Sequence, residues 1–324
     1  MLRSMYSGIS GLRNFQTKLD VIGNNISNVN TYGFKKGRTV FKDLISQTQS
    51  GASGTSQTRG GTNAKQIGLG SQLAAIDTIH GNGALQNTGR TLDLGLAGEG
   101  FFMVADSEAY APGTPPTPGA ATGTENIAYT RAGNFYMNSD GYLINSDGKY
   151  LVGYANTNID AYDSPTGGIS NFDTEKDIIT PGASIYDPTT GTFTTFTNDV
   201  APIRIPTTAQ SYSIGQDGVV SFTDAEGKLQ YAGTIILAKF PNAEGLEKMG
   251  SNYFRETQNS GDIYVQAGTQ DGLGKIESGF LEMSNVDLSE EFTEMIVAQR
   301  GFQANTRIIT TSDEILQELV NLKR

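Results

Sequence analysis

The sequence predicts a multidomain α+β protein. We expect a terminal α-helical coiled-coil domain and a discontinuous, mainly β middle domain with a small β insert. Both ends of the 324-residue chain have helical apolar spacing, and the middle has short β-type runs separated by turn signals. Residues 156–200 are rich in Thr, Asp, Gly and Asn and have few large apolar side chains, which is typical of an exposed insert. A chain of this length can form two or three domains with cores of their own.

The N-terminal segment has the spacing of an amphipathic helix. Its main apolar row is Met5, Ile9, Leu12, Leu19 and Ile26, and a second row contains Phe15, Ile22 and Val29. The helix is expected to end in residues 28–33, where Asn and Gly tolerate left-handed backbone.

The C-terminal segment has a longer heptad pattern. Its seam is Leu288, Phe292, Met295, Gln299, Phe302, Thr306, Ile309, Asp313, Leu316 and Val320. Ser289 is the expected N-cap, and the acidic residues that follow it suit the positive end of the helix dipole. Apolar residues beyond the seam, such as Ile308 and Ile315, widen the apolar face of the helix. Such a helix is expected to have more than one neighbour.

The segment between the helices reads as β structure. Apolar runs at 74–79, 100–104 and 233–238 predict strands. Turn signals at 139–141, 146–148, 216–218 and 226–227 predict hairpins. Residues 46–66 are almost all small and polar, which predicts a flexible or partner-ordered linker, and residues 106–125 read as a long Pro/Gly loop.

Composition argues against an enzyme and against several binding functions. There are no cysteines and a single histidine, His80, which lies in a turn-like segment without an acidic cluster near it in the sequence. The net charge of −11 disfavours binding to nucleic acid through phosphates. Residues 95–100 read as a turn because a strand follows them, not the helix of a phosphate-binding fingerprint. We therefore expect no catalytic, cofactor-binding or metal-binding residues, and no cofactor.

No segment of the sequence reads as a secretory signal or a membrane span. The N-terminal segment has no continuous apolar core of the kind that a cleaved signal contains. No run of residues approaches the roughly 18 apolar residues of a transmembrane helix. We expect no membrane insertion.

The terminal helices have more apolar surface than one pair of helices can bury, so copies of the chain are the expected partners. The expected assembly residues are Met5, Ile9, Leu12, Leu19, Ile22, Ile26, Leu288, Phe292, Met295, Phe302, Ile309, Leu316 and Val320. A secreted surface adhesin is an alternative that explains the β-rich middle, but it does not require apolar heptads at both ends.

Several sequence blocks closely resemble the rod and hook family of flagellar axial proteins. At the N-terminus these are residues 6–11, 19–28 and Thr31-Tyr32-Gly33-Phe34-Lys35. The later blocks are residues 91–94, 98–102, Tyr129-Thr130-Arg131-Ala132-Gly133-Asn134-Phe135, 284–288 and 295–305. The blocks span both ends and the middle, so the resemblance covers most of the chain.

Within that family, the sequence favours the flagellar hook, with the distal rod as the alternative. The helix exit at 32–35, residues 151–154 and the C-terminal residues 319–324 are similar to hook proteins, whereas residues 28–31 and 34–36 are similar to the distal rod protein. The resemblance implies a bendable tube that transmits motor torque to the filament. It also implies export through the flagellar type III apparatus without signal cleavage, growth under a hook cap, and contacts with the distal rod and the hook–filament junction proteins.

The resemblance also implies concentric layers in the assembled tube. Residues 1–30 and 287–324 are expected to form an inner helical domain that lines a channel, with residues 31–70 as a linker region. Residues 71–155 and 201–286 are expected to form the β-rich middle domain, and residues 156–200 a small outer β domain.

Overall fold

The computed structural model describes residues 2–55, 59–106, 127–155, 184–186, 193–195, 200–270 and 272–322. The chain divides into two compact units. One contains Met1–Asn30, Lys35–Gly81 and Asn285–Arg324, and we call it the helical unit. The other contains Thr31–Phe34 and Asn82–Ser284, and we call it the β-rich unit.

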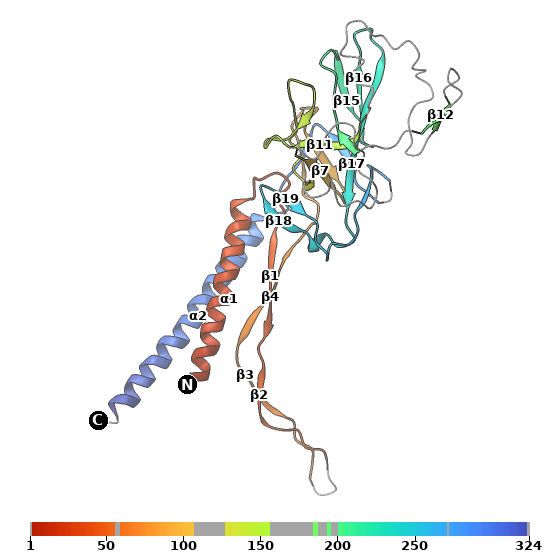
Figure 1. The fold of residues 1–324 in the computed structure, drawn as a ribbon. Coiled ribbons are helices and arrows are strands. Elements are labelled where there is room, and N and C mark those ends of the chain that lie inside the picture. Colours follow the sequence, from red (N-terminus) through yellow and green to blue (C-terminus); the bar gives the residue numbers. More distant parts are fainter. Residues whose placement is uncertain are drawn as a thin grey trace. The chain divides into compact units, whose positions relative to one another are not determined.

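Two helices from opposite ends of the chain dominate the helical unit. Helix α1 spans Leu2–Ser27 and helix α2 spans Leu288–Asn321, and they run side by side (Figure 1). Helix α1 ends immediately before the Asn- and Gly-containing segment, as predicted. The predicted cap of α2 is wrong. The Asp287 carboxylate, rather than Ser289, accepts hydrogen bonds from the backbone N–H groups of Ser289 and Glu290. Asp is as good an N-cap as Ser, and its position one residue before the helix satisfies two free donors.

A long antiparallel ribbon completes the helical unit (Figure 1). Strand β1 (Gly37–Asp43) pairs with β4 (Ser71–Thr78), and β2 (Ser46–Ser50) pairs with β3 (Lys65–Gly68). Much of the segment that the sequence assigned to a linker is therefore strand, although β2 and β3 are exposed throughout. Strand β4 was expected in the middle domain, but its partner is β1, and contacts group it with the helices.

The β-rich unit is built around one branched antiparallel sheet of 12 strands. Its main path runs in the order β15-β16-β17-β11-β7-β8-β19-β18, and β9, β10, β14 and β20 pair beside this path. These strands are β7 (Phe101–Ala105), β8 (Ile127–Thr130), β9 (Tyr136–Met137), β10 (Leu143–Ile144), β11 (Tyr150–Ala155), β14 (Val200–Pro202), β15 (Ser211–Ile214), β16 (Val219–Thr223), β17 (Leu229–Lys239), β18 (Glu247–Gly250), β19 (Tyr253–Arg255) and β20 (Tyr264–Ala267).

Four short strands form two further pairs in this unit. Strand β5 (Leu85–Asn87) pairs with β22 (Phe280–Glu282), and β6 (Leu94–Ala97) pairs with β21 (Lys275–Ser278). A 3-10 turn at Ala243–Gly245 precedes β18.

Both faces of the large sheet are covered by apolar side chains. Along β7 the side chains alternate, so that Phe102 and Val104 join one core and Phe101 and Met103 join the other. Phe102 packs edge-on against Phe135, with ring centroids 5.6 Å apart, and both side chains are fully buried. The predicted runs at 100–104 and 233–238 are strands β7 and β17, which lie in the centre of this sheet.

The hairpin turns predicted in this unit are confirmed. Gly141, Gly148, Gly218 and Gly227 all have positive φ, between 79° and 88°. Each lies between two strands that pair antiparallel. Glycine adopts this backbone at no steric cost, which explains why Asp-Gly and Glu-Gly were reliable signals.

Two predicted segments lie largely outside the described residues. The Pro/Gly loop at 106–125 is one of them, apart from its first residue. Of the insert at 156–200, the structure describes only the hairpin of β12 (Ser184–Tyr186) and β13 (Phe193–Thr195) and the first residue of β14.

Candidate assembly surface

Helices α1 and α2 approach each other closely because glycines and small side chains lie between them. A Cβ atom on Gly301 of α2 would lie 2.5 Å from the Phe15 ring of α1, and one on Gly11 would lie 2.7 Å from the Asn305 amide. A Cβ atom on Gly8 would lie 3.5 Å from the Ile309 side chain. Positions in α1 rise as their partners in α2 fall, so the helices are antiparallel.

Polar contacts join the C-terminal half of α1 to the N-terminal half of α2. The Asn25 amide donates to Glu291 Oε2 at 3.2 Å and to the Gly37 carbonyl at 2.9 Å, and it accepts from the Gly37 N–H at 3.0 Å. Lys36 Nζ lies 2.8 Å from Glu290 Oε2, and Lys18 Nζ lies 3.0 Å from Glu294 Oε2. These contacts join α1, α2 and β1.

Burial raises the pKa of the Glu291 carboxyl group above its ordinary value. The hydrogen bond from Asn25 and the charge of Lys36 lower the pKa and so oppose this shift, while Glu294 and Glu290 add to it. A carboxylate held in this way is stabilised by its partners, but its ionised form remains costly to bury.

The predicted assembly residues of α1 lie mostly along its contact with α2. Ile22 is buried, and Met5, Leu12, Leu19 and Ile26 are half-buried. Ile9 is exposed. This row of α1 is therefore largely covered within one chain.

The predicted seam of α2 divides into two groups. Met295, Ile309 and Leu316 are half-buried, whereas Leu288, Phe292, Phe302 and Val320 are exposed. The side of α2 that faces α1 is offset from the seam. It carries Glu291, Ala298, Asn305 and Ser312 at steps of seven. A pattern of large apolar side chains does not identify these residues. The available signal was a repeat of polar or small side chains every seven residues.

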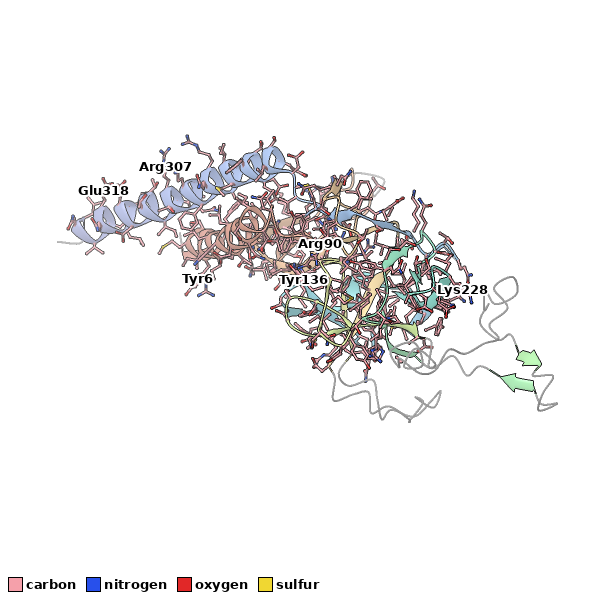
Figure 2. The ribbon with its side chains drawn as sticks, turned by 90° about the horizontal axis from the view of Figure 1, so that it is seen from above. Tyr6, Arg90, Tyr136, Lys228, Arg307 and Glu318 are labelled. Atoms are coloured by element: carbon pink, nitrogen blue, oxygen red, sulfur yellow. The ribbon has the colours of Figure 1, made fainter. Side chains whose placement is uncertain are left out.

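Large apolar side chains remain exposed in two rows on α2, one on each side of the face that contacts α1. The first row is Val297, Ile308, Ile315, Leu319 and Leu322. The second row is Leu288, Phe292, Phe302 and Val320, and Ile296 lies farther around the helix from the side that contacts α1. Phe292 is 49% exposed and Ile296 is 58% exposed, so neither is covered by its own chain. Charged residues such as Arg307 and Glu318 also project from α2 (Figure 2).

Helix α2 also extends past the start of α1. It has 34 residues against 26, and at 1.5 Å per residue it is about 12 Å longer. Because Gly8 already lies opposite Asn305 and Ile309, the last turns of α2 have no described residue of α1 beside them.

Little in the described residues suggests a chemical site. His80 follows strand β4 and is half-buried. Among the described residues, no group of three or more His, Asp or Glu side chains is placed to hold a metal ion. Within the same part of the chain, no helix is long and apolar enough to span a membrane.

Comparisons with known families match three segments of the chain. Residues 5–35 match "Flagella basal body rod protein", residues 120–222 match "Flagellar hook protein FlgE/F/G D1 domain", and residues 277–322 match "Flagellar basal body rod FlgEFG protein C-terminal". The flagellar basal-body rod protein FlgG of Bacillus subtilis is 52% identical over 325 positions, which cover both chains completely. The flagellar hook protein FlgE of Borreliella burgdorferi is 34% identical over 458 positions, again across the whole of both chains.

A crystal structure of the Helicobacter pylori flagellar hook protein FlgE2 aligns with a TM-score of 0.21 and 15% identity, over 68% of this chain and 47% of that one. A likeness this weak carries no argument. The sequence relatives are decisive: the chain belongs to the rod and hook family of flagellar axial proteins, which are structural proteins of the bacterial flagellum.

Proposed function

We propose that the chain is a structural subunit of the flagellar distal rod, which polymerises into a tube in the basal body. The observation that carries this proposal is the end-to-end match with a rod protein, which is 52% identical and aligns over 325 positions against the 324 residues here. The chain therefore has the size of a rod protein with almost no net insertion. This reverses the preference for the hook that the sequence motifs suggested.

The hook remains the second candidate because the hook relative also covers the whole chain. That alignment runs over 458 positions, so the hook protein carries long insertions that this chain lacks. The shared terminal motifs do not separate the two functions, but the length of the middle region favours the rod.

The exposed rows of α2 support assembly through unlike contacts. One row contains Phe292 and Phe302, whereas the other is aliphatic, so one copy presents two different surfaces. A contact between different surfaces on successive copies produces a ring or an open helical filament rather than a closed dimer. In this proposal the helical unit lines the channel of the tube, and the predicted assembly residues lie within or beside its helix contacts.

Complementation tests the proposal directly. The gene is expressed in two bacterial strains, one lacking its distal rod protein and the other lacking its hook protein. We expect basal bodies with complete rods, and swimming, only in the first strain. Rescue of hooks in the second strain alone would establish the hook function instead. A chain with α2 truncated after residue 314 is the matched control, and it should restore neither structure although its β-rich unit is intact.

Export without a cleaved signal is part of the same proposal. Assembled protein recovered from basal bodies should keep its N-terminal residues, as measured by mass spectrometry. Loss of the first helix on export would contradict this route.

A further inference from the structure

Three segments of the β-rich unit lie next to the points where the chain passes between the two units: 31–34, 82–84 and 282–284. Hydrogen bonds of Glu282 join all three. The chain passes between the units at 30/31, 34/35, 81/82 and 284/285. Glu282 lies at the end of strand β22, just before the last of these points. The backbone carbonyl of Glu282 accepts from Gly33 N at 2.8 Å, and its Oε1 accepts from Gly83 N at 2.8 Å. The next residue, Met283, donates to the Ala84 carbonyl at 2.9 Å.

Arg131 holds the Glu282 carboxylate from the side of the sheet. Its Nη1 lies 3.2 Å from Glu282 Oε2, and both side chains are almost completely buried, at 2% and 0% exposure. The guanidinium also lies over the Phe101 ring, 5.2 Å from its centroid. A buried ion pair of this kind costs desolvation, and apolar residues of similar size are often as stable in its place. Stability alone therefore does not explain why charges occupy this position.

Two glycines bring the backbone against this pair. Gly33 has φ +70°, and a Cβ there would lie 2.6 Å from the Arg131 carbonyl carbon and from Ala132 N. A Cβ on Gly83 would overlap the Met283 carbonyl oxygen. Only glycine allows the backbone to approach this closely. The separate motifs that contain Gly33 and Arg131 thus meet beside Glu282.

The helical unit has a corresponding arrangement within itself. Asn285 accepts from Lys36 N through Oδ1 at 2.8 Å and donates to the Ile79 carbonyl through Nδ2 at 2.8 Å. The Lys35 ammonium, which is also buried, donates to the Gly81 carbonyl at 2.8 Å. In each unit, the segments next to the crossing points of the chain are therefore held together by a small cluster of hydrogen bonds.

We infer that Arg131 and Glu282 are positioning residues, which fix the points where the chain enters and leaves the β-rich unit. Glu282 joins the three connecting segments through hydrogen bonds, and Arg131 orients its carboxylate toward Gly83. An apolar pair would fill the same space but would supply no acceptor to the Gly83 N–H. In a tube that transmits torque, this arrangement stiffens the chain segments through which force enters and leaves the β-rich unit. That mechanical consequence rests on the proposed function, whereas the positioning itself does not.

Amide hydrogen exchange on the full-length monomer tests the inference. In the double variant Arg131→Met/Glu282→Met, we expect exchange at Gly83 to accelerate at least tenfold. Exchange at Gly33, whose acceptor is the backbone of residue 282, should change less than threefold, and so should exchange at core strand β7. The variant should unfold within a few degrees of the wild type. Unchanged exchange at Gly83 would overturn the inference, and so would equal acceleration at Gly83, Gly33 and β7, because the pair would then serve only general stability.

A second measurement separates this inference from the proposed function. Tubes assembled from the double variant should bend more than wild-type tubes in electron micrographs, and the Glu282→Gln variant, which keeps an acceptor for Gly83, should lie between them. Equal bending of all three would refute the mechanical role. Failure of the wild type to form tubes would count against the proposed function, while the exchange result on the monomer would still decide the positioning role.

Discussion

The two units of the chain differ in how they treat apolar side chains. The β-rich unit covers both faces of its sheet, so that Phe102, Leu151 and Ile235 are fully buried within one chain. The helical unit leaves Phe292, Ile296 and Val320 exposed on α2. Among the described residues, the sheet of the β-rich unit is covered on both faces within one chain, whereas α2 presents rows of apolar side chains that its own unit leaves exposed. The difference separates residues needed for folding from residues available for assembly.

The strongest test compares two phenylalanines. Phe102→Ala removes a fully buried ring and should cost about 3–5 kcal/mol, which lowers the melting temperature of the monomer sharply. Phe302→Ala removes a ring that is 37% exposed on α2, and we expect the monomer to lose less stability than it does with Phe102→Ala, while tube formation is lost. Calorimetry and electron microscopy measure the two effects. Normal tubes from Phe302→Ala would mean that this row of α2 is not an assembly surface.

Limited proteolysis of the monomer should show the next largest difference. Because the helices lack part of their cover in a single chain, protease should remove roughly the first 30 and last 35 residues and leave a resistant β-rich core. The same sites should be protected in assembled tubes. Gel electrophoresis and mass spectrometry identify the cleavage products. Equal protection of both ends in monomer and tube would contradict this prediction.

A smaller effect is expected from pH at the helix pair. The folded pKa of Glu291 is raised, so its contribution to stability is present at acidic pH and is lost as pH rises through the folded pKa. Glu291→Gln should weaken that dependence, because it removes the titrating group at the contact with Asn25. The pH dependence is measured as the dissociation temperature of tubes between about pH 4 and pH 8, a range that includes the titration of carboxyl groups with raised pKa values. Identical pH profiles for the wild type and Glu291→Gln would be evidence against a role for this group.

The smallest effect is expected at His80. It lies outside both cores and the two rows of α2, so His80→Ala should assemble and support swimming nearly as the wild type does. A variant that folds and assembles but does not swim would reveal a function for this residue.

The sequence predicted the parts of the fold that depend on local chemistry. The Asp-Gly and Glu-Gly turns are set by the backbone freedom of one glycine, and the end of α1 is set by neighbouring Asn and Gly residues. The side of α2 that meets α1 was harder to find, because the contact uses Ala298, Asn305 and Ser312 rather than large apolar side chains. Close approach between helices depends on what the partner offers, in this case Gly8 and Gly11.

Non-local features were the least predictable. The Arg131–Glu282 pair joins residues 151 positions apart, and neither has a distinctive neighbour in the sequence that identifies the other. The pairing of β1 with β4 was missed for a similar reason, since the polar segment between them reads as a linker. The choice between rod and hook depended on the length of the middle region in relatives, which one sequence does not contain.

The extra turns at the end of α2 give the molecule a direction. No described residue of α1 lies beside Leu319 and Leu322, which are exposed in one chain. In a stack of identical copies in which each overhang is covered by the next molecule, the last copy has one that is not covered. The two ends of such a stack are therefore chemically different, and a newly arriving copy meets an unsatisfied apolar tip at only one of them. A polymer with that asymmetry can lengthen from a single end without any external instruction about which end to use.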